Sequence, residues 1–191
     1  LVVISIITLL VSTILPSIGK ARLYSKRVMC MTNVAALCKG LNMYETANPG
    51  WFPLAICEKT DGFEDDDETV LIVDAMKKYI ETPETWRCPA DDVGLFEDPN
   101  RRNSYEYLGV FLVLMAHGDE EQLALVNEKL LEYSREVPLI VDAEAFHPQS
   151  GHPEMRNYGF LDGHVEYTDD FQELYDQYRE SAESGTLPSE S

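Results

Sequence analysis

The chain has 191 residues and a net charge of −19, and its charged residues are unevenly distributed. Residues 1–50 carry five basic side chains and one acidic side chain, whereas the remainder carries 10 basic and 33 acidic ones. So acidic a C-terminal part argues against nucleic acid as a partner. It indicates either a highly solvated surface or the binding of cations.

The N-terminal segment is an unbroken uncharged run from Leu1 to Leu15, followed by Pro16 and a cluster of basic residues. A bilayer span needs roughly 20 apolar residues, so this run of about 15 falls short. We therefore expect either a segment that lies shallow in the membrane or a chain whose natural beginning precedes Leu1. A cleavable secretory signal is the alternative, but residues 16–21 offer only a poor cleavage site.

After Pro16, apolar and aromatic residues recur in steps of three and four, which is helical periodicity. We predict one helix over about residues 1–47, ended by Asn48-Pro49-Gly50, because proline disfavours helical geometry in the residue before it. Pro16 is expected to kink or locally melt this helix. Its first third should face lipid or sister helices. The rest should pack one face on a domain, with a stripe formed by Tyr24, Val28, Met31, Ala35, Cys38, Leu41 and Tyr44.

The middle of the chain predicts short elements joined by loops. Residues 105–115 form an apolar run that fits a strand or a buried helix, an ambiguity that periodicity alone does not resolve. The other expected elements are an extended segment over 51–57, a polar loop over 60–68, a short helix over 70–80, a brief strand over 85–88 and a helix over 119–135.

The C-terminal part predicts strands most clearly. Residues 138–142 form a short apolar run, and two further strands, 158–161 and 164–168, flank Asp162-Gly163. This dipeptide favours a type I′ hairpin turn, in which both residues have positive φ. A helix is expected over 169–180, and residues 181–191 should form a disordered polar tail.

The segment LVVISIITLLVSTILPSIGKAR resembles the N-terminal segment of type IV prepilins and type II secretion pseudopilins. In those proteins a peptidase cuts after a glycine and methylates the new N-terminal phenylalanine. Pro16 matches the characteristic proline, so the resemblance places Leu1 a few residues inside the mature terminus. The methylated phenylalanine and the glutamate that usually follows it would then precede Leu1.

Further motifs resemble the prepilin-like proteins that carry a C-terminal H-x9-DG signature, which His152 and Asp162-Gly163 match in full. The resemblance implies an α+β, pilin-like fold, with a long N-terminal helix packed on a small antiparallel sheet and additional short helices. It divides the chain into a membrane and fibre-core part (1–23), a globular head (24–180) and the acidic tail (181–191). The other landmarks are Cys30-Met31-Thr32-Asn33, Met43-Tyr44, Trp51-Phe52-Pro53, Cys88-Pro89-Ala90-Asp91 and Asn103-Ser104-Tyr105.

The function implied by the resemblance is a structural subunit of a type IV pilus-like or type II secretion pseudopilus-like fibre. Such a subunit is anchored in the inner membrane by a single helix, with its head in the periplasm, before it joins a fibre that can reach the cell surface. Its partners would be homologous subunits, the prepilin peptidase and the assembly machinery. The alternative is a membrane-anchored extracytoplasmic binding or scaffold protein that does not polymerise.

The basic cluster conflicts with this orientation. By the positive-inside rule, Lys20, Arg22, Lys26 and Arg27 would place the C-terminal domain in the cytoplasm. In prepilins a leader with its own basic residues fixes the orientation before cleavage. We therefore expect the head to be periplasmic.

Two groups of residues are candidates for metal binding. His152, Asp162 and His164, together with His147 and Asp142, could hold zinc or a similar ion. The structural alternative is that Asp162 and Gly163 only form the turn and His152 only hydrogen-bonds across a loop. Calcium could instead bind Asp65, Asp66 and Asp67 or Asp91 and Asp92, but the spacing lacks a calcium-loop pattern.

Four cysteines in an extracytoplasmic domain permit two disulfides. Cys30 and Cys88 both fall on landmarks of the resemblance, which makes them the expected pair. A Cys38–Cys57 bridge is a weaker prediction, because Cys38 could simply be a buried thiol. An enzyme would use His152 or His164 with Asp162, but the sequence contains no recognisable catalytic motif, and we expect no enzymatic activity.

Overall fold

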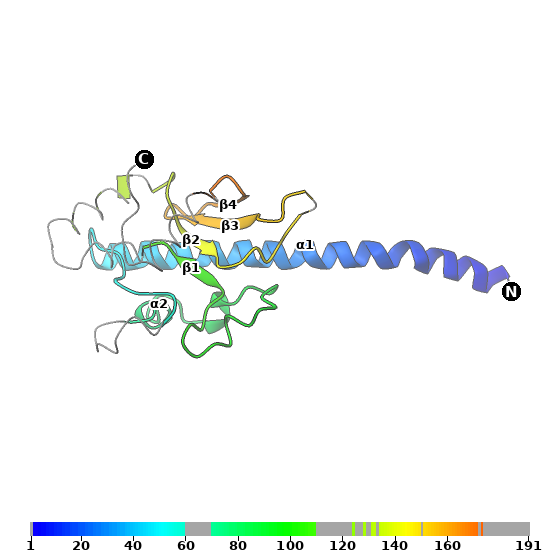
Figure 1. Cartoon of the computed structure of the whole chain (residues 1–191), viewed down its shortest axis with the longest axis horizontal. Coiled ribbons are helices and arrows are strands. Elements are labelled where there is room, and N and C mark those ends of the chain that lie inside the picture. Colours follow the sequence, from blue (N-terminus) through cyan, green and yellow to red (C-terminus); the bar gives the residue numbers. More distant parts are fainter. Residues whose placement is uncertain are drawn as a thin grey trace.

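The computed structural model describes residues 2–59, 70–109, 134–149 and 151–171, together with positions 124, 128, 131, 132 and 173. It combines one long helix, α1 (Val2–Ala47), with a small four-stranded antiparallel sheet. Figure 1 shows α1 running through the head and projecting far beyond it at the N-terminal end. The α+β class, with a long helix and a small antiparallel sheet, is therefore confirmed.

Helix α1 has the predicted extent. Its 46 residues correspond to about 69 Å at about 1.5 Å per residue. At its end the amide of Asn48 donates to the carbonyl oxygen of Tyr44 at 2.9 Å, and Gly50 turns the chain with a φ of 80°. The helix is continuous through position 16, so the expected local melting is wrong. A proline removes a single backbone hydrogen bond, and the turns on either side remain helical.

The sheet has the strand order β1–β2–β3–β4, and each neighbouring pair is antiparallel. Every residue of β2 and β3 is buried, because α1 packs against one face and a second apolar cluster covers the other. This explains why residues 138–142 read as a continuous apolar run rather than as an alternating one. The strands are β1 (Tyr105–Tyr107), β2 (Pro138–Asp142), β3 (Arg156–Phe160) and β4 (Val165–Thr168).

The predicted hairpin around Asp162-Gly163 is confirmed, but its predicted turn type is wrong. Gly163 has a φ of 91°, whereas Asp162 has a negative φ, so the turn is not type I′. The backbone amide of Gly163 donates to the carbonyl oxygen of Phe160 at 2.9 Å, and the backbone amide of Phe160 donates to the carbonyl oxygen of His164 at 3.1 Å. This pattern is a three-residue loop, built on a type I turn that ends in a left-handed glycine.

The short elements pack on the other side of α1 from β3 and β4 (Figure 1). Helix α2 covers only Ile72–Ala75, within the longer helix expected over residues 70–80. The strand expected over 85–88 is wrong, because a 3-10 helix, η1 (Pro83–Trp86), begins with a proline that suits a helical first turn. Residues 51–57 form no named strand, and Ile56 makes one isolated bridge to Leu71.

Several expectations fall outside the described residues. Of the helix expected over 119–135, the described positions Ala124, Glu128, Leu131 and Glu132 are helical. The loop at 60–68, residues 110–115, most of the helix expected over 169–180 and the tail at 181–191 lie outside the part of the chain that the structure describes.

The buried face of α1 agrees with the C-terminal part of the predicted stripe, where Cys38 and Leu41 are fully buried, and differs from its N-terminal part. Tyr24 and Val28 are exposed, because full burial of α1 in the head begins only at Cys30. At the closest approach, a Cβ placed on Gly159 of β3 would lie 2.4 Å from Val34 and 2.6 Å from Cys38, so only glycine fits there. The fully buried hydrophobic side chains of α1 are Cys30, Val34, Leu37, Cys38 and Leu41.

Candidate functional site

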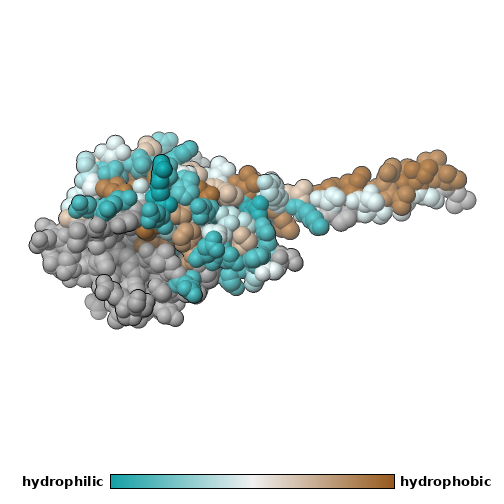
Figure 2. Space-filling view, turned by 90° about the horizontal axis from the view of Figure 1, so that it is seen from above, coloured by the Kyte–Doolittle hydropathy of each residue, from teal (hydrophilic) through white to brown (hydrophobic). Residues whose placement is uncertain are grey.

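The N-terminal half of α1 presents apolar side chains to its surroundings on all sides. Figure 2 shows this half as a largely hydrophobic rod that extends beyond the head. The helix is long and apolar enough to cross a membrane, and none of its most apolar stretch is buried within the chain. The large exposed hydrophobic residues there are Val2, Val3, Ile4, Ile6, Ile7, Leu9, Leu10, Val11, Ile14, Leu15 and Ile18.

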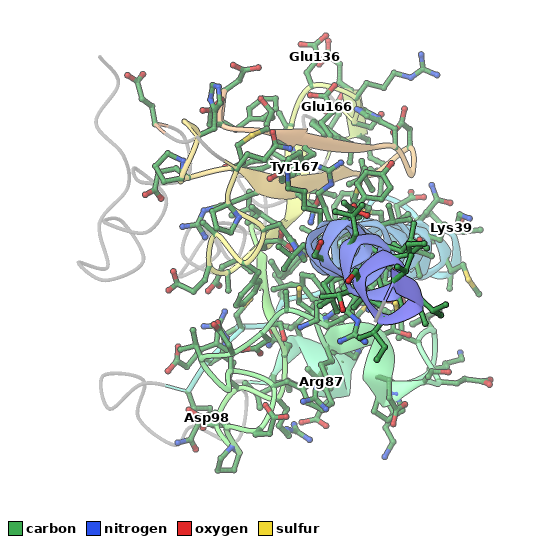
Figure 3. All side chains as sticks on the ribbon, turned by 90° about the vertical axis from the view of Figure 1, so that its right-hand side faces the viewer. Lys39, Arg87, Asp98, Glu136, Glu166 and Tyr167 are labelled. Atoms are coloured by element: carbon green, nitrogen blue, oxygen red, sulfur yellow. The ribbon has the colours of Figure 1, made fainter. Side chains whose placement is uncertain are left out.

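The helix enters the head through a junction of aromatic and basic side chains. The guanidinium carbon of Arg27 lies 4.9 Å from the ring centroid of Tyr24 and 4.5 Å from that of Tyr167 on β4. Figure 3, which looks along α1 from its N-terminal end, shows Tyr167 on the strand side and Arg87 and Asp98 on the opposite side. Arg27 therefore links the exposed and buried parts of the helix through cation–π contacts.

A buried cluster of chemically active side chains lies immediately beyond this junction. Cys30 is on α1, Cys88 follows η1, and His147 lies on the loop after β2. The two sulfur atoms and a ring nitrogen of His147 all lie within 4.8 Å of one another. The Sγ atom of Cys88 lies 3.2 Å from Nε2 of His147. Soft sulfur and imidazole nitrogen ligands thus converge from three separate segments.

Asp142, the last residue of β2, completes the cluster. The Cys30 thiol donates to Oδ1 of Asp142 at 3.0 Å, and Asn157 donates to Oδ2 from its side chain at 2.7 Å and from its backbone at 3.0 Å. Tyr105 pairs with Asp142 across β1 and β2, and its hydroxyl lies 3.4 Å from the Cys30 sulfur. The carboxylate is therefore held at one oxygen by Cys30 of α1 and at the other by Asn157 of β3.

Neighbouring backbone contacts bring the loops to this position. The Asn33 side chain on α1 donates to the carbonyl oxygen of Arg87 at 2.8 Å, which holds the chain just before Cys88 against the helix. Nη1 of Arg156 donates to the carbonyl oxygens of Asp142 and Ala143, at 2.9 and 2.6 Å. These contacts fix the two loops that carry Cys88 and His147.

The burial of the cluster changes its acid–base properties. Burial raises the pKa of Asp142 to about 7, and the neighbouring Cys88 acts in the same direction. Burial also raises the pKa of the Cys30 thiol. The neighbouring Cys30 lowers the pKa of Cys88 against the effect of burial, and His147 lowers it further. Cys88 is therefore the position at which a thiolate forms most readily.

The expected disulfide partners, Cys30 and Cys88, meet in this cluster, and both are free thiols in the structure. Their disulfide stays a prediction. Cys38 and Cys57 are also free. The sulfur of Cys57 accepts a hydrogen bond from the amide of Tyr107, whereas Cys38 packs against β3 at Gly159.

The residues of the H-x9-DG signature do not gather into the metal site considered from the sequence. At the hairpin, Oδ1 of Asp162 accepts a hydrogen bond from the backbone amide of His164 at 3.0 Å and lies 2.5 Å from Nδ1 of the His164 ring. Nδ1 of His152 instead lies 3.0 Å from Oδ2 of Asp169. Within the described residues, the group formed by Cys30, Cys88 and His147 is the one with three ligand atoms close together. The tight glycine turn explains the local pairing of Asp162 with His164.

Asp91 has a structural role in the loop after Cys88. Its carboxylate accepts hydrogen bonds from the amides of Gly94, Leu95 and Phe96 and, at 2.7 Å, from the hydroxyl of Ser104. These four donors occupy the oxygen atoms that a calcium ion would need. Asp65, Asp66 and Asp67 lie outside the described residues.

Sequence reasoning named His147 and Asp142 as candidate ligands but assigned them to the wrong partners. Cys30, Cys88 and His147 are widely separated along the chain and form no motif, so only the fold brings them together. The one sequence signal was that Cys30 and Cys88 both belong to landmark motifs. No family model, curated protein or solved structure matches the chain.

Proposed function

We propose that this protein is a non-enzymatic subunit of a type IV pilus-like or type II secretion pseudopilus-like fibre. Before assembly it is anchored in the inner membrane through α1, with its head in the periplasm. Its partners are homologous subunits, the prepilin peptidase and the assembly machinery.

The division of α1 into two halves is the observation that supports this proposal most. The N-terminal half exposes a continuous apolar surface, whereas the half from Cys30 onward is packed into the head. Apolar side chains exposed on this scale require a nonaqueous environment, either lipid or other apolar helices. A helix that is apolar on all sides can occupy a bilayer first and the centre of a helical fibre later.

The charge distribution fits the same proposal. The strongly acidic part of the sequence follows α1, so the head is highly solvated, while the basic side chains near residue 20 mark the edge of the apolar segment. Like-charged heads repel one another weakly when salt screens them, and the apolar helices provide the attraction between subunits.

The test is to express the complete gene together with its prepilin peptidase and to examine the cell envelope by electron microscopy. Fibres that react with an antibody against the head, and that appear in the fraction released by shearing, are the expected result. A chain without residues 1–23 should give no fibres, because it lacks the apolar part of α1.

Two point variants make the test sharper. Leu10→Lys places a charge in the middle of the apolar run, where insertion in a bilayer costs about 2.5–3.5 kcal/mol, and should abolish both membrane retention and fibres. Leu23→Lys is the matched control, because Leu23 is also exposed but lies beside the basic cluster. Membrane-bound monomers without fibres, in cells where the peptidase has cut the wild-type chain, would favour the anchored binding or scaffold protein.

A further inference from the structure

We propose that Cys30, Cys88 and His147 bind a zinc ion, with Asp142 beside it, and that this ion fastens α1 to the head. The proposal does not depend on fibre formation, because all four residues belong to the head and its part of α1. It shares His147 and Asp142 with the zinc site considered from the sequence, but two cysteines take the place of His152, Asp162 and His164.

The spacing of the ligand atoms fits a small tetrahedral ion. Bonds of about 2.3 Å to sulfur and about 2.0 Å to nitrogen place the two ligand atoms about 3.5 Å apart in a tetrahedral site. Sγ of Cys88 and Nε2 of His147 lie 3.2 Å apart, and Sγ of Cys30 lies within 4.8 Å of both. Shifts of a few tenths of an ångström to about one ångström therefore suffice to coordinate one ion.

Asp142 contacts the group through one of its three members, Cys30. Its Oδ1 lies 3.0 Å from the Cys30 sulfur, about half an ångström closer than the roughly 3.6 Å that separates a sulfur and an oxygen ligand of one tetrahedral ion. The amide groups of Asn157 hold the carboxylate by its other oxygen, Oδ2. Oδ1 faces the Cys30 sulfur, and loss of the Cys30 proton on metal binding frees it from its present hydrogen bond.

Charge favours a cation at this position. Two thiol groups and a carboxylate are buried together, and the donors to that carboxylate, Cys30 and Asn157, carry no positive charge. The buried guanidinium of Arg156 donates to the backbone oxygens of Asp142 and Ala143. Buried ionised groups are costly unless they are paired or coordinate a metal. A divalent ion would neutralise the charge of two thiolates at once. Sulfur ligands favour zinc, whereas calcium and magnesium prefer oxygen ligands.

The position of the cluster gives the ion a structural role. Cys30 is the first fully buried residue described along α1, so the ion would lie where the helix leaves the head. It would join the helix to the loops that follow η1 and β2. Structural zinc sites stabilise folding directly, because the ligands are brought together only in the folded chain.

The test begins with the full chain isolated from membranes in detergent without reductant. Elemental analysis is expected to find one zinc ion per chain. Replacement of zinc by cobalt should give the visible absorption of a tetrahedral site and a thiolate-to-cobalt charge-transfer band. Removal of the ion with a chelator should lower the midpoint of thermal unfolding of the head, and zinc should restore it.

Matched variants assign the ligands. Cys88→Ala and His147→Ala should each lose the bound zinc and the cobalt spectrum, while the circular dichroism of α1 reports whether the variant still folds. Cys38→Ala removes a buried cysteine of the same helix outside the cluster, and His152→Ala removes a histidine of the H-x9-DG signature. Both controls should keep one ion per chain.

Three outcomes would overturn the proposal. The first is wild-type protein that contains no zinc and gains no cobalt spectrum after mild reduction. The second is a Cys30–Cys88 disulfide, found by mass spectrometry after free thiols have been alkylated in unreduced membranes. The third is zinc that remains in Cys88→Ala and His147→Ala but disappears in His152→Ala. If the cluster variants fail to fold, the wild-type chain still tests the proposal, because removal of zinc by the chelator should lower its midpoint of thermal unfolding.

Discussion

The two halves of α1 are one continuous helix in two opposite environments. From Cys30 onward, the helix is enclosed by the sheet on one side and by α2 and η1 on the other. Before that residue its apolar side chains lie on the exterior of the chain. The packed half is stabilised by burial within the protein, whereas the projecting half can bury its surface only against something outside it. Equivalent substitutions in the two halves should therefore have very different effects.

The largest difference is expected for leucine-to-alanine substitutions. Leu37 is fully buried in the main hydrophobic core, so Leu37→Ala should lower the free energy of unfolding of the head by about 2–5 kcal/mol. Leu9→Ala, in the projecting half, should change it by less than about 0.5 kcal/mol, because Leu9 is 67 % exposed. Chemical denaturation in detergent, followed by tryptophan fluorescence, measures both. Equal losses would show that the two halves unfold as one cooperative unit.

The next effect concerns the contact between α1 and β3. Gly159→Ala should destabilise the head by about 1–3 kcal/mol, since a methyl group there overlaps Val34 and Cys38. Gly19→Ala is the control, because a Cβ at that helical position meets nothing within 4 Å. It should raise helix stability slightly, by up to about 1 kcal/mol. A neutral Gly159→Ala variant would mean that the helix can move away from the sheet.

A comparable effect is expected in the loop that follows Cys88. Asp91→Ala should cost about 1–3 kcal/mol at neutral pH, through the loss of hydrogen bonds from Ser104 and three backbone amides. Burial acts to raise the pKa of Asp91, but these donors together hold it below its ordinary value. Because the pKa of Asp91 is lower in the folded state than in the unfolded state, its carboxylate stabilises the folded state at pH values above its ordinary pKa of about 3.9. This stabilisation is lost as the pH falls through the pKa of the folded state.

The pH dependence provides the check on Asp91. The difference in unfolding free energy between wild type and Asp91→Ala should be largest above pH of about 4 and should shrink in more acidic solution. The exposed neighbour Asp92 serves as the control, and Asp92→Ala should leave stability nearly unchanged. If the difference in unfolding free energy instead grew towards low pH, the carboxylate of Asp91 would not be the group that stabilises this loop.

The smallest effect is expected at the junction between the two halves. Arg27→Ala should destabilise the docking of α1 on β4 by about 0.5–1 kcal/mol, because it removes the cation–π contacts with Tyr24 and Tyr167. Lys26→Ala, one position earlier on an exposed part of the helix, should have almost no effect. Hydrogen exchange of the first packed turns of α1 is the sensitive measurement. Equal protection in the two variants would rule out a role for Arg27.

Sequence periodicity predicted the long helix, strand β2 and the C-terminal hairpin, because each is determined by local patterns. It predicted the buried face of α1 only in part, since Cys38 and Leu41 of the predicted stripe are fully buried but the point at which the head begins depends on layers that arrive from distant parts of the chain. Tyr24 and Val28 continue the apolar period but precede the head, and so remain exposed. The strand expected over residues 85–88 failed because the preceding proline starts a helical turn.

The candidate site was predicted only in part for the same reason. Asp142 and His147 were recognised as possible ligands, but hairpin residues were assigned to them because these lie near in sequence. The antiparallel register instead pairs Asp142 with Tyr105, and the packing of α1 brings Cys30 to the carboxylate. Convergence of residues from α1, a loop after η1 and a loop after β2 is a property of the fold and leaves no spacing pattern in the sequence.

The continuity of α1 also fixes the rotational phase between the head and whatever its projecting half contacts. An α-helix turns by about 100° per residue, so one residue inserted near position 23 would rotate the head by about 100° around the helix axis. Four inserted residues would complete about 1.1 turns and nearly restore the original orientation. Because α1 is helical from Val2 to Ala47, this rotation would be passed on without being absorbed by a loop. The number of residues between the apolar run and Cys30 therefore sets the direction in which the head faces.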